Sequence, residues 1–277
     1  MTAPAVKLVV VAGTRVAVTR RDGAELVILT RLAGRGAGIW DGLWSRLAKR
    51  FTVANVDLSL PEGSLLDDPG AVFDGYADLT VRVARELGHP RFHVFGWNGG
   101  SHIALHAAAR RSDALFSCTL LGAFSTLPDM RRAEAGVAFM RTMMNQPDKE
   151  LYALYWFMSG LTPGFVEEHY DRVAALARRR AEADRFVHMD IERLTKWIKA
   201  LRRHWLSDAE LNRIRIPVTI LAPDLDLWHA GPTVAMARAL AERIPTATLE
   251  VLEDAGSLIA LEDPDRIAHL FLSSLRN

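Results

Sequence analysis

The sequence has few of the features that would tie a protein to a membrane, a nucleic acid or an oxidising compartment. Its 277 residues include one cysteine, and 34 Lys and Arg side chains nearly balance 33 Asp and Glu side chains, for a net charge of +1. A single thiol excludes an internal disulfide, and this balance leaves no basic footprint for nucleic acid. No segment approaches the roughly 18 consecutive apolar residues that span a bilayer. We therefore expect a cytoplasmic protein with no nucleic-acid or membrane partner.

Other absences narrow the function further. The N-terminus lacks the basic segment and long apolar core of a signal peptide. No cluster of His, Cys and carboxylate residues has metal-ligand spacing, so we expect neither a bound metal nor a cofactor. Cys118 lies in an apolar run and is expected to be a buried strand residue. The basic clusters at 178–180 and 202–203 lie in charge-mixed helical sequence, and we expect them to form solvated helix faces.

Short apolar segments alternate with helical patterns through most of the chain. Strands are predicted at 7–11, 16–19, 25–29, 51–57, 92–95, 114–121, 216–221 and 248–252, and helices at 40–49, 72–87, 103–109, 233–243 and from 264 onward. Strands that alternate with helices indicate βαβ units and a parallel sheet. The predicted fold class is therefore α/β, with a doubly wound, mostly parallel sheet.

One long segment, 126–215, differs from its surroundings. It is almost wholly helical in pattern, is rich in Arg, Met and aromatic residues, and contains no convincing strand. A helical segment that interrupts a doubly wound sheet is typical of a lid over the carboxyl ends of the strands. We therefore expect a core made of residues 1–125 and 216–277, with an all-helical lid at 126–215.

The pentapeptide Gly-Trp-Asn-Gly-Gly at 96–100 is the most informative motif. It follows the predicted strand 92–95 and opens an alanine-rich helix, which is the setting of a nucleophile elbow, G-x-S-x-G. Asn98 stands where that motif has serine. A carboxamide is a poor nucleophile, because its nitrogen lone pair is delocalised into the carbonyl group. The sequence thus predicts the scaffold of a hydrolase without its attacking atom.

Further segments, in the same order along the chain, resemble the motifs of the α/β-hydrolase superfamily with a helical cap. Residues 32–35 (LAGR) occupy the place of the L-H-G-x oxyanion loop, and the family's aromatic residue follows at Trp40. Residues 55–64 (NVDLSLPEGS) are similar to the D-x-x-G-x-G-x-S turn. Residues 217–226 (PVTILAPDLD) are similar to P-x-L-x-L-x-G-x-x-D, which ends on the triad acid, and residues 254–257 (DAGS) lie where the family has x-x-G-H.

The resemblance implies a catalytic triad in which two members are replaced. The nucleophile has become Asn98, the histidine has become Ser257, and the oxyanion-loop histidine has become Ala33, whereas Asp226 keeps the acid. In an ordinary triad the histidine takes the proton of the nucleophile and the acid orients that histidine. Replacement of both removes covalent acyl transfer.

The resemblance also implies that the oxyanion hole survives. Its donors in this superfamily are backbone N–H groups, one after the nucleophile and one in the loop after the third strand. These would belong to Gly99 and to Arg35, beside Gly34. Backbone donors do not depend on the lost side chains. Together with Asn98 and Ser257 they would grip a carbonyl group without attacking it.

Each of the candidate side chains has a second interpretation. Asn98 contacts a ligand, or it is a structural residue that tolerates a positive φ angle, or it deamidates to a nucleophilic aspartate. Asp226 is a general base, or it caps the loop after its strand. His229 supplies imidazole chemistry or is exposed on a loop. His102, one helical turn after Asn98, is a further candidate or a packed helix residue.

The aromatic residues indicate what the site binds. Trp97 and Trp228 flank the mouth of the site on the family pattern, and Trp156 is one of many aromatic and Met side chains in the predicted lid. Such side chains form the core of a lid or line a pocket, because ligand pockets are mainly apolar. The expected ligand is an apolar small molecule that carries a carbonyl group. His93 and His106 are expected to be structural.

Three classes of function stay open. The first is an enzyme that does not hydrolyse: it would catalyse cyclisation, cycloaddition, isomerisation or carbon–carbon bond chemistry in natural-product biosynthesis, without a covalent intermediate. The second is an inactive binding protein or receptor for a small molecule. The third is an atypical esterase with a relocated base. We favour the first, in a monomer or homodimer.

Overall fold

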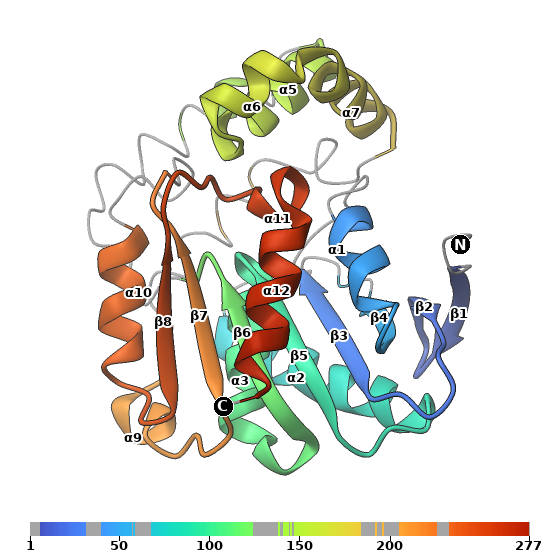
Figure 1. Cartoon of the computed structure of the whole chain (residues 1–277), viewed down its shortest axis with the longest axis vertical. Coiled ribbons are helices and arrows are strands. Elements are labelled where there is room, and N and C mark those ends of the chain that lie inside the picture. The colour runs from blue at the N-terminus through green and yellow to red at the C-terminus, as the bar shows by residue number, and fades with distance from the viewer. Residues whose placement is uncertain are drawn as a thin grey trace.

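The structure, a computed structural model, describes residues 6–31, 40–56, 58, 68–123, 138, 141–143, 145, 147–183, 192, 196, 205–225 and 233–276. Its centre is an eight-stranded sheet in the order β1-β2-β4-β3-β5-β6-β7-β8 (Figure 1). The strands are β1 (Lys7–Val11), β2 (Thr14–Thr19), β3 (Leu26–Arg31), β4 (Thr52–Val56), β5 (Phe92–Trp97), β6 (Leu115–Leu121), β7 (Val218–Pro223) and β8 (Ala247–Leu252).

Most of the sheet is parallel. The β1–β2 and β2–β4 pairs are antiparallel, and every pair from β4 to β8 is parallel. Parallel strands are covered on both faces and therefore consist of nearly continuous apolar runs. All six residues of β3 and all six of β5 are buried, as this rule requires. The predicted α/β class, with a doubly wound and mostly parallel sheet, is confirmed.

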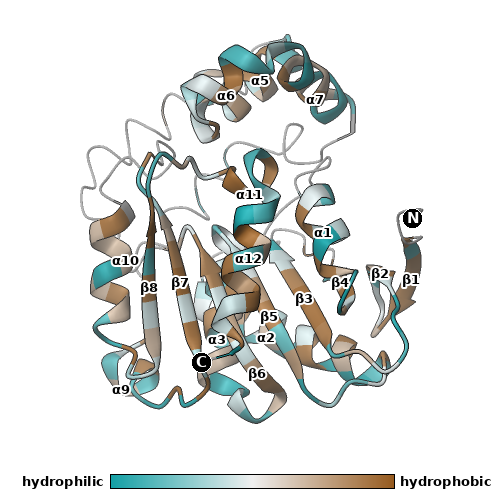
Figure 2. Cartoon of the chain, viewed as in Figure 1, coloured by the Kyte–Doolittle hydropathy of each residue, from teal (hydrophilic) through white to brown (hydrophobic). Residues whose placement is uncertain are grey.

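Helices cover both faces of the sheet, whose central strands are strongly hydrophobic (Figure 2). Alternate residues of a strand belong to the cores on opposite faces: Leu26 and Ile28 of β3 to one, Val27 and Leu29 to the other. One core lies under α2 (Pro69–Glu86), α3 (Gly99–Arg110) and α10 (Thr233–Ala241). The other lies under α1 (Asp41–Leu47) and α12 (Pro264–Ser274). In the first core, α3 packs against β5. The chain must therefore turn sharply between the end of β5 and the start of α3.

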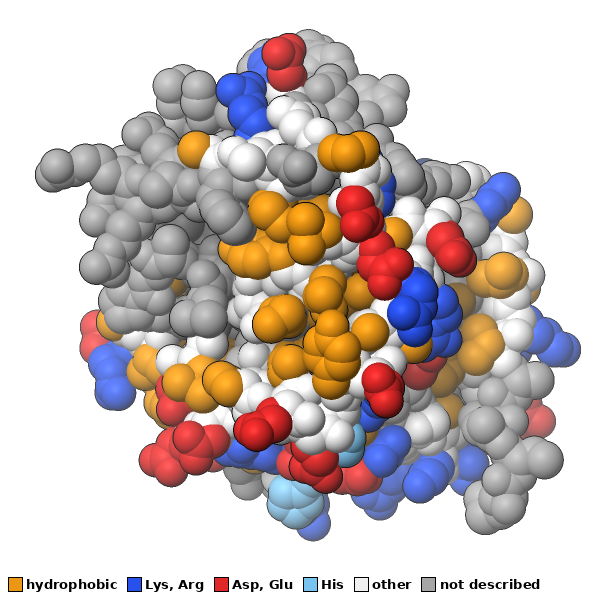
Figure 3. Space-filling model, turned by 90° about the horizontal axis from the view of Figure 1, so that it is seen from above, with side chains coloured by type: hydrophobic (Ala, Val, Ile, Leu, Met, Phe, Trp, Pro, Cys, Tyr) orange, Lys and Arg blue, Asp and Glu red, His pale blue; other side chains and the backbone are white. Residues whose placement is uncertain are grey.

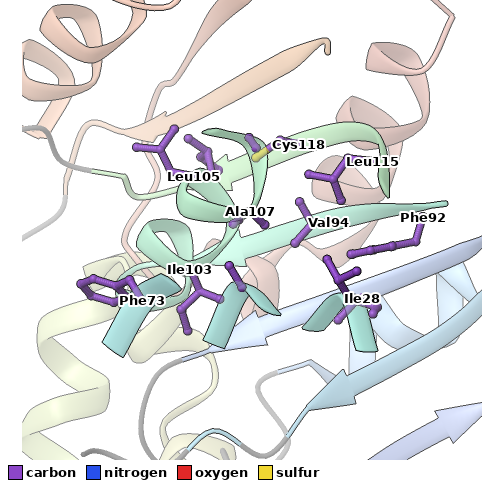
Figure 4. Packing of buried hydrophobic residues seen from close by; sticks show 14 of the residues in the cluster. Ile28, Phe73, Phe92, Val94, Ile103, Leu105, Ala107, Leu115 and Cys118 are labelled. Carbon is purple, nitrogen blue, oxygen red and sulfur yellow. The ribbon is translucent and has the colours of Figure 1, made fainter. Parts of the chain in front are cut away.

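Cys118 is a buried residue of β6, as the sequence predicts. It is paired in register with Val94 of β5 and belongs to the core under α3 (Figure 4). Burial raises the pKa of the Cys118 thiol, because the thiolate would have no solvation there. The thiol is therefore a packing group and not a nucleophile.

Three helices lie beyond the carboxyl ends of the parallel strands (Figure 1): α5 (Lys149–Gly160), α6 (Pro163–Glu168) and α7 (Tyr170–Ala183). Asp148 caps α5 by accepting hydrogen bonds from the first backbone N–H groups, and Thr162 caps α6. Seen from above, apolar side chains gather on this face between acidic and basic ones (Figure 3). The exposed apolar residues of α5 are Leu151, Tyr155 and Met158.

Residues 205–215, at the end of the predicted lid segment, pack on the core. They contain the short helix α9 (Asp208–Leu211). Leu206, Leu211 and Ile214 are buried in the same cluster as Val218 of β7. The limits of the lid at 126 and 215 stay a prediction, since much of that segment lies outside the described residues. No helix in the described part of the chain is long and apolar enough to cross a membrane.

Candidate functional site

The turn between β5 and α3 has the backbone of a nucleophile elbow. Asn98 separates the strand from the helix and has φ 51° and ψ −118°. This conformation is strained for a residue with a side chain, because ψ lies far from the left-handed helical region near +47°. Asparagine tolerates a positive φ angle better than most residues. The chain therefore keeps the sharp bend at the position where the motif has its nucleophile.

Two glycines allow this bend. A Cβ atom on Gly100 would lie 2.0 Å from the carbonyl oxygen of Thr30, and one on Gly96 would lie 2.5 Å from the carbonyl oxygen of Gly100. Thr30 also donates its hydroxyl hydrogen bond to the carbonyl of Gly100, at 3.0 Å. The first turn of α3 thus packs directly on β3, with no room for side chains at either glycine.

Ser101, the nearest hydroxyl along the chain, is occupied by the backbone. Its Oγ lies 3.0 Å from the carbonyl oxygen of Gly96 and 3.2 Å from that of Leu121. The Asn98 N–H also donates to the Leu121 carbonyl, at 2.9 Å. These bonds hold the elbow to β6 and leave Ser101 in a structural role. Gly99 begins α3, so its N–H has no acceptor within the helix.

The loop that carries Ser257 is fixed from three sides. Trp97 donates its indole N–H to the carbonyl oxygen of Ser257 at 2.7 Å. The N–H of Ala255 donates to Asp224 Oδ1 at 3.1 Å, and the N–H of Leu258 donates to the carbonyl of Gly160 at 2.8 Å. The structure therefore brings the predicted residues Trp97 and Ser257 together, from positions 160 residues apart.

Ser257 has a buried hydroxyl group. The residue is 1% exposed, and among the described residues its Oγ has no hydrogen-bond partner. A buried hydroxyl without a partner is unfavourable by about 1–3 kcal/mol. A polar group that bonded to this hydroxyl would remove that penalty.

The end of α5 and the start of α6 pack against the loop that carries Ser257 and against the short helix that follows it. A Cβ atom on Gly256 would lie 2.4 Å from the carbonyl oxygen of Gly160, at the end of α5. Glu262, at the end of α11 (Ile259–Glu262), accepts hydrogen bonds from the N–H (2.7 Å) and the hydroxyl (2.8 Å) of Thr162. Burial raises the pKa of Glu262. The end of α5 and the start of α6 are thus held beside Ser257.

Aromatic rings connect α5 to the elbow. The rings of Trp97 and Trp156 meet edge to face with centroids 6.2 Å apart, and Trp40 meets Trp97 in the same way at 6.2 Å. Trp97 and Trp40 are buried, whereas Trp156 is half-buried. The predicted ligand-binding residues Trp97 and Trp156 therefore contact each other, and Trp97 immediately precedes Asn98 in the chain.

The expectation for the basic cluster at 178–180 is wrong for Arg180. Arg178 and Arg179 are exposed, but Arg180 is 1% exposed. Its guanidinium Cζ lies 3.6 Å from the centre of the Trp156 ring. Val173, at helical spacing before it, is also buried, so Arg180 continues the buried stripe of α7. This spacing was the sequence signal that could have identified Arg180.

His102 and His106 are both buried on α3. His102 stacks on Phe73 with ring centroids 5.3 Å apart, and also meets Trp205 at 5.4 Å. His106 Nδ1 lies 2.7 Å from Asp74 Oδ1. The surroundings of His102 are thus aromatic and packed, which favours its structural interpretation.

Five of the predicted site residues lie outside the described residues, so their roles stay predictions. They are the acid, the nearby histidine and tryptophan, and two residues of the oxyanion loop: Asp226, His229, Trp228, Gly34 and Arg35. Among the residues that the structure does describe, no three His, Cys, Asp or Glu side chains gather as a metal site.

A serine, a histidine and a glutamate form a hydrogen-bonded row elsewhere in the sheet. His93 Nδ1 lies 2.8 Å from Ser117 Oγ, and His93 Nε2 lies 3.1 Å from Glu25 Oε2. Burial lowers the pKa of His93, partly offset by Glu25. These residues lie at the amino ends of the strands, whereas ligands of open parallel sheets bind at the carboxyl ends. Ser117 is also 5% exposed, so the row satisfies buried polar groups rather than presenting a nucleophile.

The comparisons with known proteins agree with this geometry. The sequence model described as the alpha/beta hydrolase family matches residues 23–270. A protein described as a carbamate hydrolase, RutD, from Pseudomonas syringae pv. syringae (strain B728a), is 30% identical over 194 residues, which cover 66% of this chain and 68% of that protein.

Two similar solved structures are enzymes by name. The 2-hydroxy-6-oxo-6-phenylhexa-2,4-dienoate hydrolase from Rhodococcus sp. strain RHA1 has a TM-score of 0.76 and 18% identity, with 99% of this chain and 100% of that one covered. The enol-lactonase from Burkholderia xenovorans LB400 has a TM-score of 0.72 and 20% identity, with 98% and 100% covered. At these identities the likeness shows the fold.

Substitution of Gly100 should destabilise the elbow strongly. In Gly100→Ala the new methyl group would meet the Thr30 carbonyl, so the free energy of unfolding should fall by about 3 kcal/mol or more. Gly75→Ala is the matched control, because Gly75 lies in α2 with open space around its Cβ position. That change should raise the free energy by about 0.5–1 kcal/mol. Urea unfolding measures both, and equal effects would contradict the packing described for Gly100.

Glu262 should make stability depend on pH. Its folded-state pKa lies above its ordinary value of 4.5, mainly because it is buried. Its contribution to stability is therefore complete below that value and is lost as the pH rises through the folded-state pKa. Glu262→Gln removes this titration but keeps an oxygen for the Thr162 N–H. The unfolding free energy of the wild type minus that of the variant should fall from acidic pH towards neutrality; a constant or rising difference would exclude this role.

A serine-directed fluorophosphonate should leave the protein unmodified. Ser101 is bonded to the backbone, and Ser117, the partner of His93, is buried, so neither hydroxyl is open to attack. Intact-mass spectrometry measures the adduct, with a serine protease in the same reaction as the positive control. An adduct on Ser117 that is lost in Ser117→Ala would identify the row with His93 as a working nucleophile.

Proposed function

Because this chain belongs to the alpha/beta hydrolase family, we propose that it uses the family's elbow to bind and polarise a carbonyl group without attacking it. The ligand is an apolar small molecule. The chemistry is a cyclisation, cycloaddition, isomerisation or carbon–carbon bond reaction, of the kind found in natural-product biosynthesis. No covalent intermediate forms.

The observation that carries this proposal is the strained backbone of Asn98. The elbow keeps φ 51° and ψ −118°, together with the two glycines that permit it, although the residue at its tip has no nucleophilic atom. A strained conformation costs about 1–3 kcal/mol and persists only where the surrounding packing enforces it. A retained elbow with an amide at its tip supports a site that binds a ligand, since the amide both donates and accepts hydrogen bonds.

The surrounding groups supply the rest of the chemistry. The N–H of Gly99 has no acceptor within the helix, and the buried hydroxyl of Ser257 has no partner among the described residues. Donors of this kind that are fixed before the reaction stabilise negative charge as it develops on a carbonyl oxygen, and loss of one such donor costs about 3–4 kcal/mol in activation free energy. The Trp97–Trp156 pair supplies an apolar contact surface.

The relatives are named as hydrolases. The residues at the nucleophile and histidine positions of this chain therefore bear on whether it also hydrolyses its ligand. Hydrolysis in this fold requires a nucleophile at the elbow and a histidine that activates it. Positions 98 and 257 of this chain hold Asn and Ser. The second candidate is therefore a small-molecule receptor on the same scaffold, which uses the same contacts but releases its ligand unchanged.

The carbonyl contact can be measured with benzylideneacetone, an apolar enone. A hydrogen bond to its carbonyl oxygen shifts the absorbance band to longer wavelength, so binding to the wild type should produce a red shift that Asn98→Ala reduces. Asn98→Asp is the matched variant, because it keeps the size of the side chain but replaces the N–H donors with an acceptor; it should also lose the shift. An unchanged shift in both variants would exclude Asn98 as the contact.

Turnover separates the enzyme from the receptor. Molecules extracted from the purified protein should be returned to fresh protein and analysed by mass spectrometry. An isomerisation or cyclisation changes retention but conserves mass, hydrolysis adds one water, and a receptor returns the same compound. In Asn98→Ala the rate of an isomerisation should fall by about 10²–10³-fold.

A further inference from the structure

We propose that the edge of the sheet at β1 binds a second copy of this chain, and that the two β1 strands pair antiparallel about a two-fold axis at Val9. The inference is independent of the proposed function, because β2, β4 and β3 lie between β1 and the strand that leads to the elbow (Figure 1). It starts from two apolar side chains of β1 that stand in solvent. Leu8 is 77% exposed and Val10 is 74% exposed.

Exposure of this kind is unusual for the edge of a sheet. Edge strands normally carry charged side chains, prolines or bulges that prevent pairing with another chain. The strand at the opposite edge, β8, follows this rule, because its exposed side chains are Thr248 and Glu250. In contrast, β1 has the sequence KLVVV, without proline, and pairs with β2 in a regular register from Lys7 to Val11. The edge at β1 is therefore suited to pairing, whereas the edge at β8 is protected from it.

The turn between β1 and β2 determines which backbone groups face outward. Both residues of this turn have positive φ angles, 50° at Ala12 and 75° at Gly13, as in the two-residue turns of hairpins. The residues that flank such a turn are hydrogen-bonded to each other, and along an antiparallel pair every second residue repeats this arrangement. Val11 flanks the turn, so it points its N–H and C=O groups towards β2. Leu8 and Val10 therefore point theirs towards the edge of the sheet.

These outward groups are complementary to themselves about a two-fold axis at Val9. In that register Leu8 of one copy lies opposite Val10 of the other, and such a pair exchanges both of its N–H···O=C hydrogen bonds. Residues directly opposite each other share a face of the sheet. The exposed apolar side chains of both copies would therefore form one cluster, and pairing would remove from water the surface that the single chain exposes.

The charges at the two ends of β1 favour the same register. Glu86, at the end of α2, accepts a hydrogen bond from the N–H of Ala12 at 2.8 Å. Pairing about Val9 places Lys7 of the second copy opposite Val11, the residue before Ala12. Val11 packs in the core under α2, so Lys7 of the second copy would extend along this face towards Glu86. Each end of the paired strands would thus bring a cation of one copy to an anion of the other.

The expected dimer is reversible, because short strands form a small interface. Standard protein interfaces bury about 1,200–2,000 Å² in total, and transient ones bury less. A strand of 5 residues belongs to the second class. We therefore expect a Kd in the micromolar range. Pairing about a two-fold axis uses the β1 edge of both copies, so assembly ends at the dimer.

Sedimentation velocity across the micromolar concentration range measures the assembly. The wild type should change from monomer to dimer as its concentration rises. In Leu8→Lys a charge replaces part of the apolar cluster, so the Kd should rise about tenfold or more. Thr248→Lys is the matched control, because it places the same charge on an exposed position of the opposite edge strand. This control should dimerise as the wild type does.

Val9→Cys tests the register directly. The two-fold axis places residue 9 of one copy opposite residue 9 of the other, in a non-hydrogen-bonded pair whose Cα atoms lie about 4.5 Å apart. This separation is within the range of a disulfide. Mild oxidation should therefore link Val9→Cys into a dimer on a non-reducing gel. The wild type, whose one thiol is the buried Cys118, should not be linked, and neither should Thr248→Cys.

The outcomes decide the proposal without reference to the elbow. A wild type that stays monomeric across the whole range excludes the interface. Species larger than a dimer, or a dimer that Leu8→Lys leaves intact, would overturn the pairing of β1 strands. A dimeric wild type whose Val9→Cys variant is not linked on oxidation would overturn the register. Circular dichroism checks that each variant is folded, which we expect of Leu8→Lys because that side chain lies in solvent.

Discussion

The contact between Gly100 and the carbonyl oxygen of Thr30 is the constraint on which the site depends. It presses the first turn of α3 onto β3, so that the chain must reverse direction within the few residues that join β5 to the helix. Asn98 absorbs this reversal in its backbone angles. The strain at residue 98 is therefore imposed by the packing of the sheet, and it persists whichever side chain stands there. The sharp bend between β5 and α3 therefore does not depend on the chemistry of the side chain at its tip.

A second group of contacts ties the helices beyond the sheet to the same place. The end of α5 bonds to the loop of Ser257, Thr162 bonds to Glu262, and Trp97 bonds to the backbone of Ser257. Any movement of α5 must therefore move or release the loop where the family has its histidine. The elbow and these helices are therefore coupled through ordinary hydrogen bonds and close packing.

The sequence predicted the sheet and the elbow well, because both depend on local patterns. Continuous apolar runs mark β3 and β5, and the spacing of Gly96 and Gly100 reflects contacts that exclude any Cβ atom. Contacts between distant segments could not be predicted in this way. The charged sequence at 178–180 predicted that Arg180 is solvated. The burial of its side chain depends instead on which face of α7 packs against α5. The pairing of Trp97 with Ser257, 160 residues apart, has no local pattern at all.

The most direct measurement of the central claim is to place a nucleophile at the tip of the elbow. Asn98→Cys should react with p-nitrophenyl acetate in a burst of one equivalent and remain acetylated, because residue 257 is a serine that cannot activate water for deacylation. The wild type should show no burst, since its one thiol, Cys118, is fully buried. A burst from the wild type, or an introduced thiol in Asn98→Cys that is as inert as Cys118, would contradict the account.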